Sequence, residues 1–515
     1  MVGGGSAGWL VAGVLAAELG ITGRNLVSVT LVESPDVKTI GVGEGTWPTM
    51  RGTLQKIGIT ESEFLVECSA SFKQGTKFFG WVTGQPDDSY HHPFTAPTGY
   101  THTNLVRHWQ GRKDGASFGA AVCPQAVICD RGFAPKQAGT PEYAAVANYG
   151  YHLDAGKFAS LLQSHCISRL GVRHVLDHVT AVNGAENGDI RSLTTAERGD
   201  LEGDLFVDCS GLVGLLIAKH FGVSWISRRD VLFNDSALAL QVVEGGSDLP
   251  IASQTLSTAR EAGWIWDIGL TTRRGIGYTY SSQHTTDAAA ERVLDSYVRE
   301  HCRQVSSAFE PRKIAFNPGH RREFWHRNCV AVGMSAGFIE PLEASALVMV
   351  ELSARFMVEE FPATRAAMDV VAKRFNQLFT YRWDRIIDFL KLHYVLSLRD
   401  DHSYWQDHRE ASGIPESLRD LLTVWRHRPP WHADFPHRDE VFSAASYQYV
   451  LYGMGFKTVD SSGTFRAEEV ARAERLFAET SRIAEKWLAH LPANRELLRH
   501  VAQHGLPRAA PHPAA

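Results

Sequence analysis

Small and apolar residues follow one another in an unusual order between positions 331 and 352. The first half of this stretch is rich in Gly, Ala and Ser, and such a backbone can lie close against a flat group. An apolar run follows Pro341, a residue that suits the first turn of a helix, so a buried helix is expected from about Pro341 to Glu360. The free N–H groups of a helix start attract anions, and Glu343 would lie beside them. On this stretch alone, Glu343 is best interpreted as complementing the helix dipole.

Alternating and helical patterns predict the elements of the rest of the chain. Strands are expected at residues 27–33, 71–81, 171–175, 205–211, 263–270, 275–281 and 324–330, the fifth and sixth forming a hairpin. Helices are expected after residue 8 and at 153–170, 212–221, 353–360, 363–388 and 467–491, whereas 402–437 reads as irregular. Strands and helices therefore alternate over most of the chain, which is typical of a mixed α/β protein.

Composition limits the possible classes of protein but does not decide the function. The 515 residues are 44% hydrophobic and 21% charged, as in ordinary globular proteins, and a net charge of −5 gives no basic bias for nucleic acid or an anionic membrane. No apolar run reaches membrane-spanning length, so no membrane association is expected. The seven cysteines are scattered, odd in number and without a C-x-x-C pair. This argues against a disulfide framework and a thiolate metal site, and favours a reducing, cytoplasmic location.

The N-terminus carries a dinucleotide-binding pattern. Gly3, Gly5 and Gly8 form G-x-G-x-x-G immediately before an Ala/Leu-rich helix, and Glu33 ends the next predicted strand. The glycines allow a tight turn and close approach to a pyrophosphate, while the acidic residue can hold a ribose hydroxyl. The strand that should precede Gly3 is nearly absent.

Two later segments resemble further approaches of backbone to the same cofactor. One is the apolar strand that ends in Asp208, Cys209, Ser210 and Gly211, and the other is the strand that leads to Gly333. A site assembled from early, middle and late segments favours FAD over NAD. The Gly-rich loop at residues 41–48 could lie against the flavin or be a plain loop, and its residues alone favour neither interpretation. No second G-x-G-x-x-G is visible, so the chain is not expected to reduce its own flavin from a stably bound NAD(P)H. The predicted cofactor contacts are Gly3, Gly5, Ser6, Ala7, Gly8, Glu33, Val42, Gly43, Glu44, Gly45, Asp208, Ser210, Gly333 and Leu347.

Other candidate residues remain ambiguous when each is taken alone. Lys73 lies on a predicted strand, on the same side as Lys77, where a lysine is usually just solvated. His92, Pro93 and Phe94 read as aromatic stacking groups or as a packed loop, and not as a metal signature. Trp264 and Trp266 share one face of a strand, where paired Trp are usually core but can also line an aromatic chamber.

Taken together, these segments resemble the flavin-dependent tryptophan halogenases and their indole-halogenating relatives. The resemblance is carried by GGGSAGW at 3–9, GVGEGTWP at 41–48, SFKQGTKF at 71–78, LFVDCSG at 205–211, GWIWDIGL at 263–270 and GFIEPLEAS at 337–345. These motifs span almost the whole chain in the family's order. The W-x-W-x-I motif discriminates most, because related flavin hydroxylases lack it.

The resemblance implies a mechanism and a role for each candidate. Reduced FAD, supplied by a separate NAD(P)H-dependent flavin reductase, and dioxygen oxidise chloride or bromide to hypohalous acid, which passes through the protein to a separate aromatic pocket. Lys73 would hold the oxidant there, and Glu343 would activate it or take the ring proton. The halide would lie at Ser345 and Ala346. The small indole-type substrate would lie among His92, Pro93, Phe94, Trp264 and Trp266.

The sequence also departs from this family. Gly269 stands where a Pro is usual after W-x-W-x-I, and Ala344 stands where a Ser is usual beside the glutamate. The place of a glutamate that grips the ammonium of free tryptophan falls near His437, so no carboxylate is expected there. We therefore hypothesise that indole, a substituted indole or an indole within a larger molecule is preferred over tryptophan. An aromatic hydroxylase is the first alternative, and a flavin-binding protein without catalysis is the second.

The expected fold is α/β (α+β), with an FAD-binding three-layer ββα Rossmann-like fold of the flavin monooxygenase type and a mainly helical substrate-binding lobe. The FAD-binding module would be discontinuous, with segments 1–80, 145–225 and 312–360. The substrate-binding lobe would comprise 81–144, 226–311 and 361–505, followed by a frayed tail at 506–515. A homodimer remains an open alternative.

Overall fold

The computed structural model describes residues 1–20, 27–37, 43–245, 248–303, 305, 309–437, 439–459 and 465–508. The chain divides into two compact units. Unit 1 comprises Met1–Ala70, Leu153–Arg229 and Phe316–Trp383, and unit 2 comprises Ser71–His152, Asp230–Ala315 and Asp384–Ala515. Both units contain helices and strands, so the mixed α/β class is confirmed. The functional labels of the two predicted lobes, and their boundaries, stay predictions.

The central sheet of unit 1 is built around a strand of a single residue. Val2 bridges Val32 on one side and Asp208 on the other, both in parallel. β1 (Thr30–Glu33) pairs in parallel with β7 (Arg173–Leu176), and β11 (Phe206–Asp208) pairs in parallel with β20 (Cys329–Ala331). The resulting order, numbered along the chain, is 3-2-1-4-5, that of a doubly wound sheet. The strand before Gly3 is thus present, but reduced to one residue.

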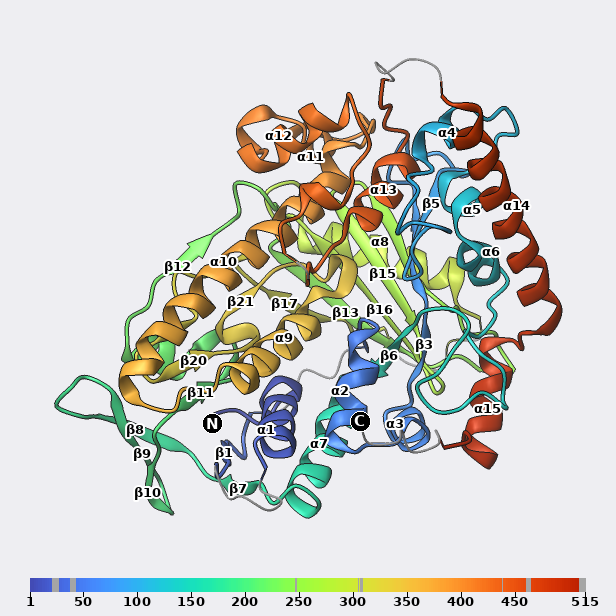
Figure 1. The fold of residues 1–515 in the computed structure, drawn as a ribbon. Coiled ribbons are helices and arrows are strands. Elements are labelled where there is room, and N and C mark those ends of the chain that lie inside the picture. Colours follow the sequence, from blue (N-terminus) through green and yellow to red (C-terminus); the bar gives the residue numbers. More distant parts are fainter. Residues whose placement is uncertain are drawn as a thin grey trace. The chain divides into compact units, whose positions relative to one another are not determined.

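Helices of unit 1 surround α1 (Ser6–Glu18), which packs against α2 (Thr49–Ile57), α7 (Ala155–Ser168) and α9 (Ser345–Glu359) (Figure 1). Because α1 is apolar on all sides, it can be buried from several directions. α3 (Glu61–Glu67) follows α2 and is capped by the Thr60 hydroxyl. Two small antiparallel sheets complete the unit: β8 (Val179–Gly184), β9 (Ile190–Thr195) and β10 (Gly199–Glu202), and β12 (Trp225–Ser227), β18 (Gly319–Arg321) and β21 (Gly337–Phe338).

Three expectations for unit 1 were wrong in detail. The predicted helix at 212–221 is a 3₁₀ turn, Gly211–Val213, followed by a short π-helix, Leu215–His220. The predicted strand at 324–330 is a tight hairpin of β19 (Trp325–His326) and β20, turned at Arg327 with φ of 53°. The helix expected from Pro341 begins only at Ser345, because Leu342–Ala344 form a 3₁₀ turn.

Unit 2 contains a seven-stranded sheet in the order β17-β13-β16-β15-β14-β4-β5. Its strands are β4 (Gly75–Phe79), β5 (Ser89–Pro93), β13 (Ser236–Val242), β14 (Thr255–Arg260), β15 (Gly263–Gly269), β16 (Arg274–Tyr280) and β17 (Arg312–Ala315). The predicted hairpin is confirmed as β15 and β16, paired from Gly263 with Tyr280 to Gly269 with Arg274. α8 (Asp287–His301) covers part of this sheet, since Leu294 and Tyr297 pack in one core with Leu238 and Ile276.

Helices make up much of the remainder of unit 2. They are α4 (Val106–Gln110), α5 (Phe118–Val122), α6 (Pro124–Asp130), α11 (Ser403–Asp407), α12 (Glu416–Trp425), α13 (Ala444–Gly453), α14 (Ala467–His490) and α15 (Asn494–His504). The unit boundary falls inside α10 (Arg365–Val395). The helix predicted at 467–491 is confirmed, whereas the interpretation of 402–437 as irregular missed α11 and α12.

The state of the cysteines and the hydrophobicity of the helices follow from the structure. All seven cysteines are free thiols in this structure. Within the described ranges, no helix combines the length and hydrophobicity needed to cross a bilayer. In the same ranges, no group of three or more His, Cys, Asp or Glu side chains is arranged to hold a metal ion.

Candidate active site

The glycine-rich turn of unit 1 lies at the carboxyl ends of the central strands. Gly3 has φ of 109°, and a Cβ there would lie 2.3 Å from the carbonyl oxygen of Cys209. A Cβ at Gly8 would lie 1.9 Å from the carbonyl oxygen of Gly3, so helix and turn are in backbone contact. A Cβ at Gly5 would meet no atom within 4 Å. Gly3 and Gly8 are therefore required by the fold, whereas Gly5 faces open space at the uncapped start of α1.

Glu33 ends β1 beside this turn, as the sequence predicted. A Cβ at Gly4 would lie 2.0 Å from the carboxyl carbon of Glu33, so the carboxylate lies against the glycine backbone. Its Oε2 accepts hydrogen bonds from Nε2 of His174 at 3.1 Å and from Nε2 of Gln163 at 3.2 Å. These two side chains orient a carboxylate that can accept further bonds from ribose hydroxyls.

Asp208 has a structural role that the sequence did not indicate. Its Oδ1 accepts from the backbone N–H and the hydroxyl of Ser210, and its Oδ2 accepts from the N–H groups of Leu216 and Ile217 at 2.7 and 2.9 Å. The carboxylate therefore fixes the turn from β11 into the π-helix. Contact with a cofactor at this segment would come from its backbone.

The late segment also reaches the start of α1. Gly333 has φ of 71°, and a Cβ there would lie 2.9 Å from Cβ of Ala7. Ser6 is buried, with its hydroxyl 3.4 Å from the carbonyl oxygen of Ala155. Unit 1 thus brings the early, middle and late segments together, and this glycine-lined cradle fits a dinucleotide. In the Gly-rich loop, β2 (Gly43–Gly45) is described, whereas Val42 lies outside the described residues.

The backbone at Glu343 is strained. Glu343 has φ of 63° and Ala344 has φ of 54°, the only consecutive pair of non-glycine residues with positive φ in the part of the chain that the structure describes. Each such residue costs about 1–2 kcal/mol. The Glu343 side chain is buried, and its carbonyl oxygen accepts a hydrogen bond from Nε1 of Trp47 at 2.9 Å. Strain of this kind is stored at functional sites when the surroundings hold it in place.

The left-handed pair leads directly into α9. Ala344 is the N-cap residue, and its methyl group cannot accept a hydrogen bond from the first turn. Ser345 and Leu347 are buried, whereas Ala346 is exposed. The predicted halide residues are therefore the first two residues of an uncapped helix, where N–H groups and the helix dipole favour an anion.

In unit 2, the predicted strand at 71–81 is interrupted at Gln74, which separates β3 (Ser71–Lys73) from β4. Gln74 is buried and its backbone N–H donates to the carbonyl of Ser253 at 2.7 Å, away from the β3 ladder. Gly75 follows with φ of 143°, where a Cβ would lie 2.3 Å from the carbonyl oxygen of His92. The period-2 argument that put Lys73 and Lys77 on one side is therefore wrong. Lys73 is 1% exposed, whereas Lys77 forms an ion pair with Asp130 at 2.7 Å.

The structure brings Lys73 and Phe94 together. Nζ of Lys73 lies 5.3 Å from the ring centroid of Phe94, within the range of a cation–π contact. The N–H of Phe94 donates to the carbonyl of Gln74 at 3.0 Å, so the residue after Lys73 also positions the ring. His92 and Pro93 are buried in β5, where the His92 ring packs near Phe389 and Tyr449.

Trp264 and Trp266 have the contacts of core residues. Their rings lie 6.2 Å apart, and Trp264 also packs against Trp81 at 6.1 Å. The Trp266 ring covers Gly277, its cross-strand partner, where a Cβ would lie 2.0 Å from the ring. Their part in substrate binding stays a prediction.

His152 is a neighbour of Lys73 that the sequence did not single out. In the antiparallel pair of β3 with β6 (Gly150–Asp154), Lys73 faces Gly150 and Ser71 faces His152, so Lys73 and His152 share a face. Nε2 of His152 lies 2.8 Å from the hydroxyl of Thr255. Burial first, and then the charge of Lys73, hold the pKa of His152 well below its usual 6.5. Lys73 therefore has a neutral imidazole beside it.

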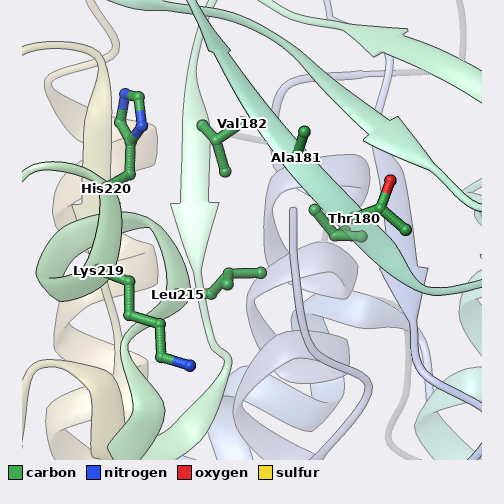
Figure 2. Close-up of a pocket in the computed structure, with 7 residues that line it drawn as sticks. Thr180, Ala181, Val182, Leu215, Lys219 and His220 are labelled. Atoms are coloured by element: carbon green, nitrogen blue, oxygen red, sulfur yellow. The ribbon is translucent and has the colours of Figure 1, made fainter.

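A separate pocket of roughly 220 Å³ lies in unit 1 between β8 and the π-helix (Figure 2). Lys219 and His220 extend from the π-helix on one side, and Thr180, Ala181 and Val182 belong to β8 on the other (Figure 2). Most of these lining residues are exposed, so the pocket is a surface hollow. None of the predicted site residues lines it.

Comparison with known proteins gives one consistent result. The sequence model of the family described as tryptophan halogenase matches residues 1–468. The chain is 32% identical to tryptophan 6-halogenase SttH of Streptomyces toxytricini and 32% identical to tryptophan 7-halogenase RebH of Lentzea aerocolonigenes, in each case over 98% of both proteins. Among solved structures, a tryptophan halogenase from Shewanella frigidimarina is 47% identical with a TM-score of 0.95, covering 99% of this chain and 98% of that one.

These relatives match along their whole length, and the class they define is that of the flavin-dependent halogenases. The chain belongs to the tryptophan halogenase family. It is a flavin-dependent halogenase that uses reduced FAD from a separate flavin reductase and a halide as co-substrate. The aromatic hydroxylase is not favoured.

The glycine turn gives a paired test of fold and cofactor binding. Gly8→Ala should destabilise the protein by at least about 2 kcal/mol, because its Cβ would overlap a backbone carbonyl. Gly5→Ala should leave the unfolding free energy of the apoprotein nearly unchanged but weaken FAD binding at least about tenfold, because the methyl group fills the cradle. Urea denaturation and titration with FAD measure the two effects. Unchanged FAD affinity in Gly5→Ala would place the cofactor elsewhere.

Buried Glu351 on α9 predicts a pH dependence of stability. Burial raises its pKa from 4.5 to about 7, so the folded protein keeps a proton that the unfolded chain releases above pH 4.5. Its contribution to stability should therefore be complete below pH 4.5, fall as the pH rises towards 7, and be constant above. The total loss should be about 3 kcal/mol.

Glu351→Gln should remove this part of the pH dependence, measured by urea denaturation at pH 5 and pH 8. Glu67→Gln, at an exposed position of α3, is the matched control. Burial also raises the pKa of Glu44 to about 7, so a slope of the same sign should remain in the Glu351 variant. A slope identical to that of the wild type would contradict the assignment.

Proposed function

We propose that this enzyme halogenates an indole-type aromatic ring, with Lys73 and Glu343 as its catalytic residues. The observation that carries the proposal is the buried Glu343, held in a left-handed conformation immediately before the uncapped start of α9. A helix that merely needed a dipole-complementing carboxylate would not require two strained residues in succession.

Unit 1 would bind FAD in a three-layer Rossmann-like arrangement of the flavin monooxygenase type. In this proposal Glu33 holds the ribose, the N–H groups at the start of α1 face the pyrophosphate, and Gly333 and the loop at 43–45 lie along the rest of the cofactor. When bound, reduced FAD supplies, with dioxygen, the oxidation that converts a halide into hypohalous acid. The halide would lie at the N–H groups of Ser345 and Ala346.

Lys73 would hold the oxidant in the substrate pocket. Its ammonium can donate a hydrogen bond to the oxygen of hypohalous acid, which polarises the oxygen–halogen bond and leaves the halogen as the electrophile. As the halogen–carbon bond forms, the departing hydroxide takes a proton from Lys73 and leaves as water. The neutral His152 beside Lys73 adds no competing positive charge, and the Phe94 ring stabilises the ammonium through its face.

Glu343 would take the ring proton that electrophilic substitution releases. A carboxylate positioned as a general base typically contributes about 10²–10⁴-fold to the rate. The overall reaction is then balanced: hypohalous acid and the arene give the aryl halide and water, Glu343 releases the ring proton to solvent, and Lys73 regains its proton from solvent.

The preference for indole over tryptophan needs one correction. A carboxylate does lie beside His437, because Oε1 of Glu440 accepts a hydrogen bond from the His437 N–H at 3.1 Å. The proposed preference therefore rests on Gly269 and Ala344. The carbonyl of Gly269 accepts a hydrogen bond from the Ser71 hydroxyl at 2.6 Å, two residues before Lys73, so this departure from the family lies close to the proposed pocket.

The catalytic assignment is tested with FAD, a flavin reductase, bromide or chloride, and indole. Halogenated product, identified by its isotope pattern, should form only when halide is present. Lys73→Met and Glu343→Gln should each lower kcat at least about 100-fold with FAD affinity retained. Lys77→Met is the matched control, because Lys77 pairs with Asp130 and should leave turnover unchanged. Oxygenated product without halide, or full activity in Lys73→Met, would contradict the proposal.

Substrate class is tested by comparing kcat/KM for indole and for tryptophan. Indole should be favoured at least about tenfold, since a charged amino acid finds fewer dedicated contacts. Glu440→Gln separates the alternatives: if Glu440 grips an ammonium, this variant loses kcat/KM for tryptophan and keeps that for indole. A clear preference of the wild type for tryptophan would refute the substrate proposal and leave the halogenase assignment intact.

A further inference from the structure

A buried carboxyl joins two helices of unit 1 that each begin beside a proposed part of the active site. Glu351 lies on α9 and is 6% exposed. Its Oε2 accepts a hydrogen bond from the hydroxyl of Thr49 at 3.0 Å, and its Oε1 accepts one from the hydroxyl of Thr53 at 2.5 Å. The two threonines are four residues apart on α2, so they lie on the same face of that helix.

The position of this contact links it to function. α2 begins directly after the Gly-rich loop that ends at Pro48, and α9 begins two residues after Glu343, with Ala344 as its N-cap. A second bond joins the same two segments, from Nε1 of Trp47 to the carbonyl of Glu343 at 2.9 Å. The loop and the strained turn are therefore linked twice. Trp47 bonds to the backbone carbonyl of Glu343, and the threonines of α2 bond to the Glu351 carboxyl, about two helical turns into α9.

A buried carboxyl group costs desolvation free energy, which a purely structural contact between two helices does not require. Among the residues that the structure describes, no ion pair of Glu351 offsets its burial: on α1 and α2, Glu18 and Lys56 pair with each other, and Arg51 donates to the carbonyl of Pro48. The 3₁₀ turn Gly333–Ser335, also packed on α9, carries no charged residue, and Glu343 is the charged residue of the turn before α9. Desolvation is the leading cause that raises the pKa of Glu351, and the two threonine hydroxyls oppose it. Two apolar side chains would join these helices more stably.

We propose that Glu351, Thr49 and Thr53 form a positioning device that holds the Gly-rich loop at 43–48 in fixed register with Glu343 and the start of α9. Glu351 is thus a positioning residue and not a catalytic one. It acts by keeping the loop proposed to face the flavin aligned with the helix start proposed to bind the halide. The inference rests on the proposed function of these two segments.

The device is tested first at Thr53. Thr53→Val removes the hydroxyl at nearly constant size, and Thr53→Ser retains it. Thr53→Val should weaken FAD binding to the apoprotein about tenfold, the effect of about one lost hydrogen bond to a buried carboxyl. It should also raise hydrogen exchange in peptides covering residues 43–57, and lower the yield of halogenated product per reduced FAD consumed. Thr53→Ser should behave like the wild type in all three measurements.

A double-mutant cycle with Glu351→Met isolates the contact. If Thr53 acts through the carboxyl, adding Thr53→Val to Glu351→Met should change FAD affinity and product yield less than twofold further. Glu351→Met should fold, since it replaces a desolvated carboxyl by an apolar side chain of similar length. Ser353→Ala is the control on the same helix, because its hydroxyl donates within α9 to the Met349 carbonyl.

The outcomes separate this inference from the proposed function. Normal FAD affinity and product yield in both Thr53→Val and Glu351→Met would overturn the positioning role while wild-type halogenation stands. Equal losses in Thr53→Val and Thr53→Ser, or additive losses in the double variant, would overturn it as well. A wild type that makes no halogenated product would instead overturn the proposed function.

Discussion

The strained turn at Glu343 and Ala344 is the constraint on which the proposed site depends. Two consecutive left-handed residues without glycine do not persist unless neighbouring groups hold them, and the Trp47 indole does so by bonding to the Glu343 carbonyl. Relaxing the turn to ordinary helical angles would extend α9 backwards, move Glu343 onto the helix surface and close the uncapped first turn. The side-chain direction of the proposed base and the open N–H groups of the proposed halide site therefore arise from one backbone feature.

Local geometry explains why the sequence predicted the glycine-rich turn and the strand that ends at Glu33. Gly3, Gly8 and Glu33 lie within one short stretch, and each has a local requirement: Gly3 has a positive φ, Gly8 contacts the Gly3 carbonyl, and Glu33 ends a parallel strand. Local requirements leave local signals. Even the one-residue first strand follows, because Val2 needs only its two bridges to place Gly3 between β1 and β11.

Features that depend on distant partners left no such signal. The break at Gln74 is caused by bonds to Ser253, Phe133 and Phe94, so alternation along 71–81 could not reveal it, and the side assigned to Lys77 was wrong. The late start of α9 depends on Trp47, almost 300 positions earlier, whereas Pro341 alone argued for an earlier start. Asp208 is a different case, because its four donors are local and lie in the turn that follows it, whereas its motif predicted a cofactor contact that stays a prediction.

Buried polar groups in this protein differ in how well hydrogen bonds compensate their burial. The Asp208 carboxylate accepts hydrogen bonds from backbone and hydroxyl donors, and these bonds offset the cost of its desolvation. Glu351 accepts hydrogen bonds from two threonine hydroxyls, and Lys73 lies near the face of the Phe94 ring and a neutral imidazole. Both side chains are ionisable and buried, so desolvation opposes their charged forms. A buried residue that lowers the stability of the fold is kept when it takes part in catalysis or positions other groups. Lys73 and Glu351 are therefore better candidates for function than Asp208, whose hydrogen bonds are made within the fold.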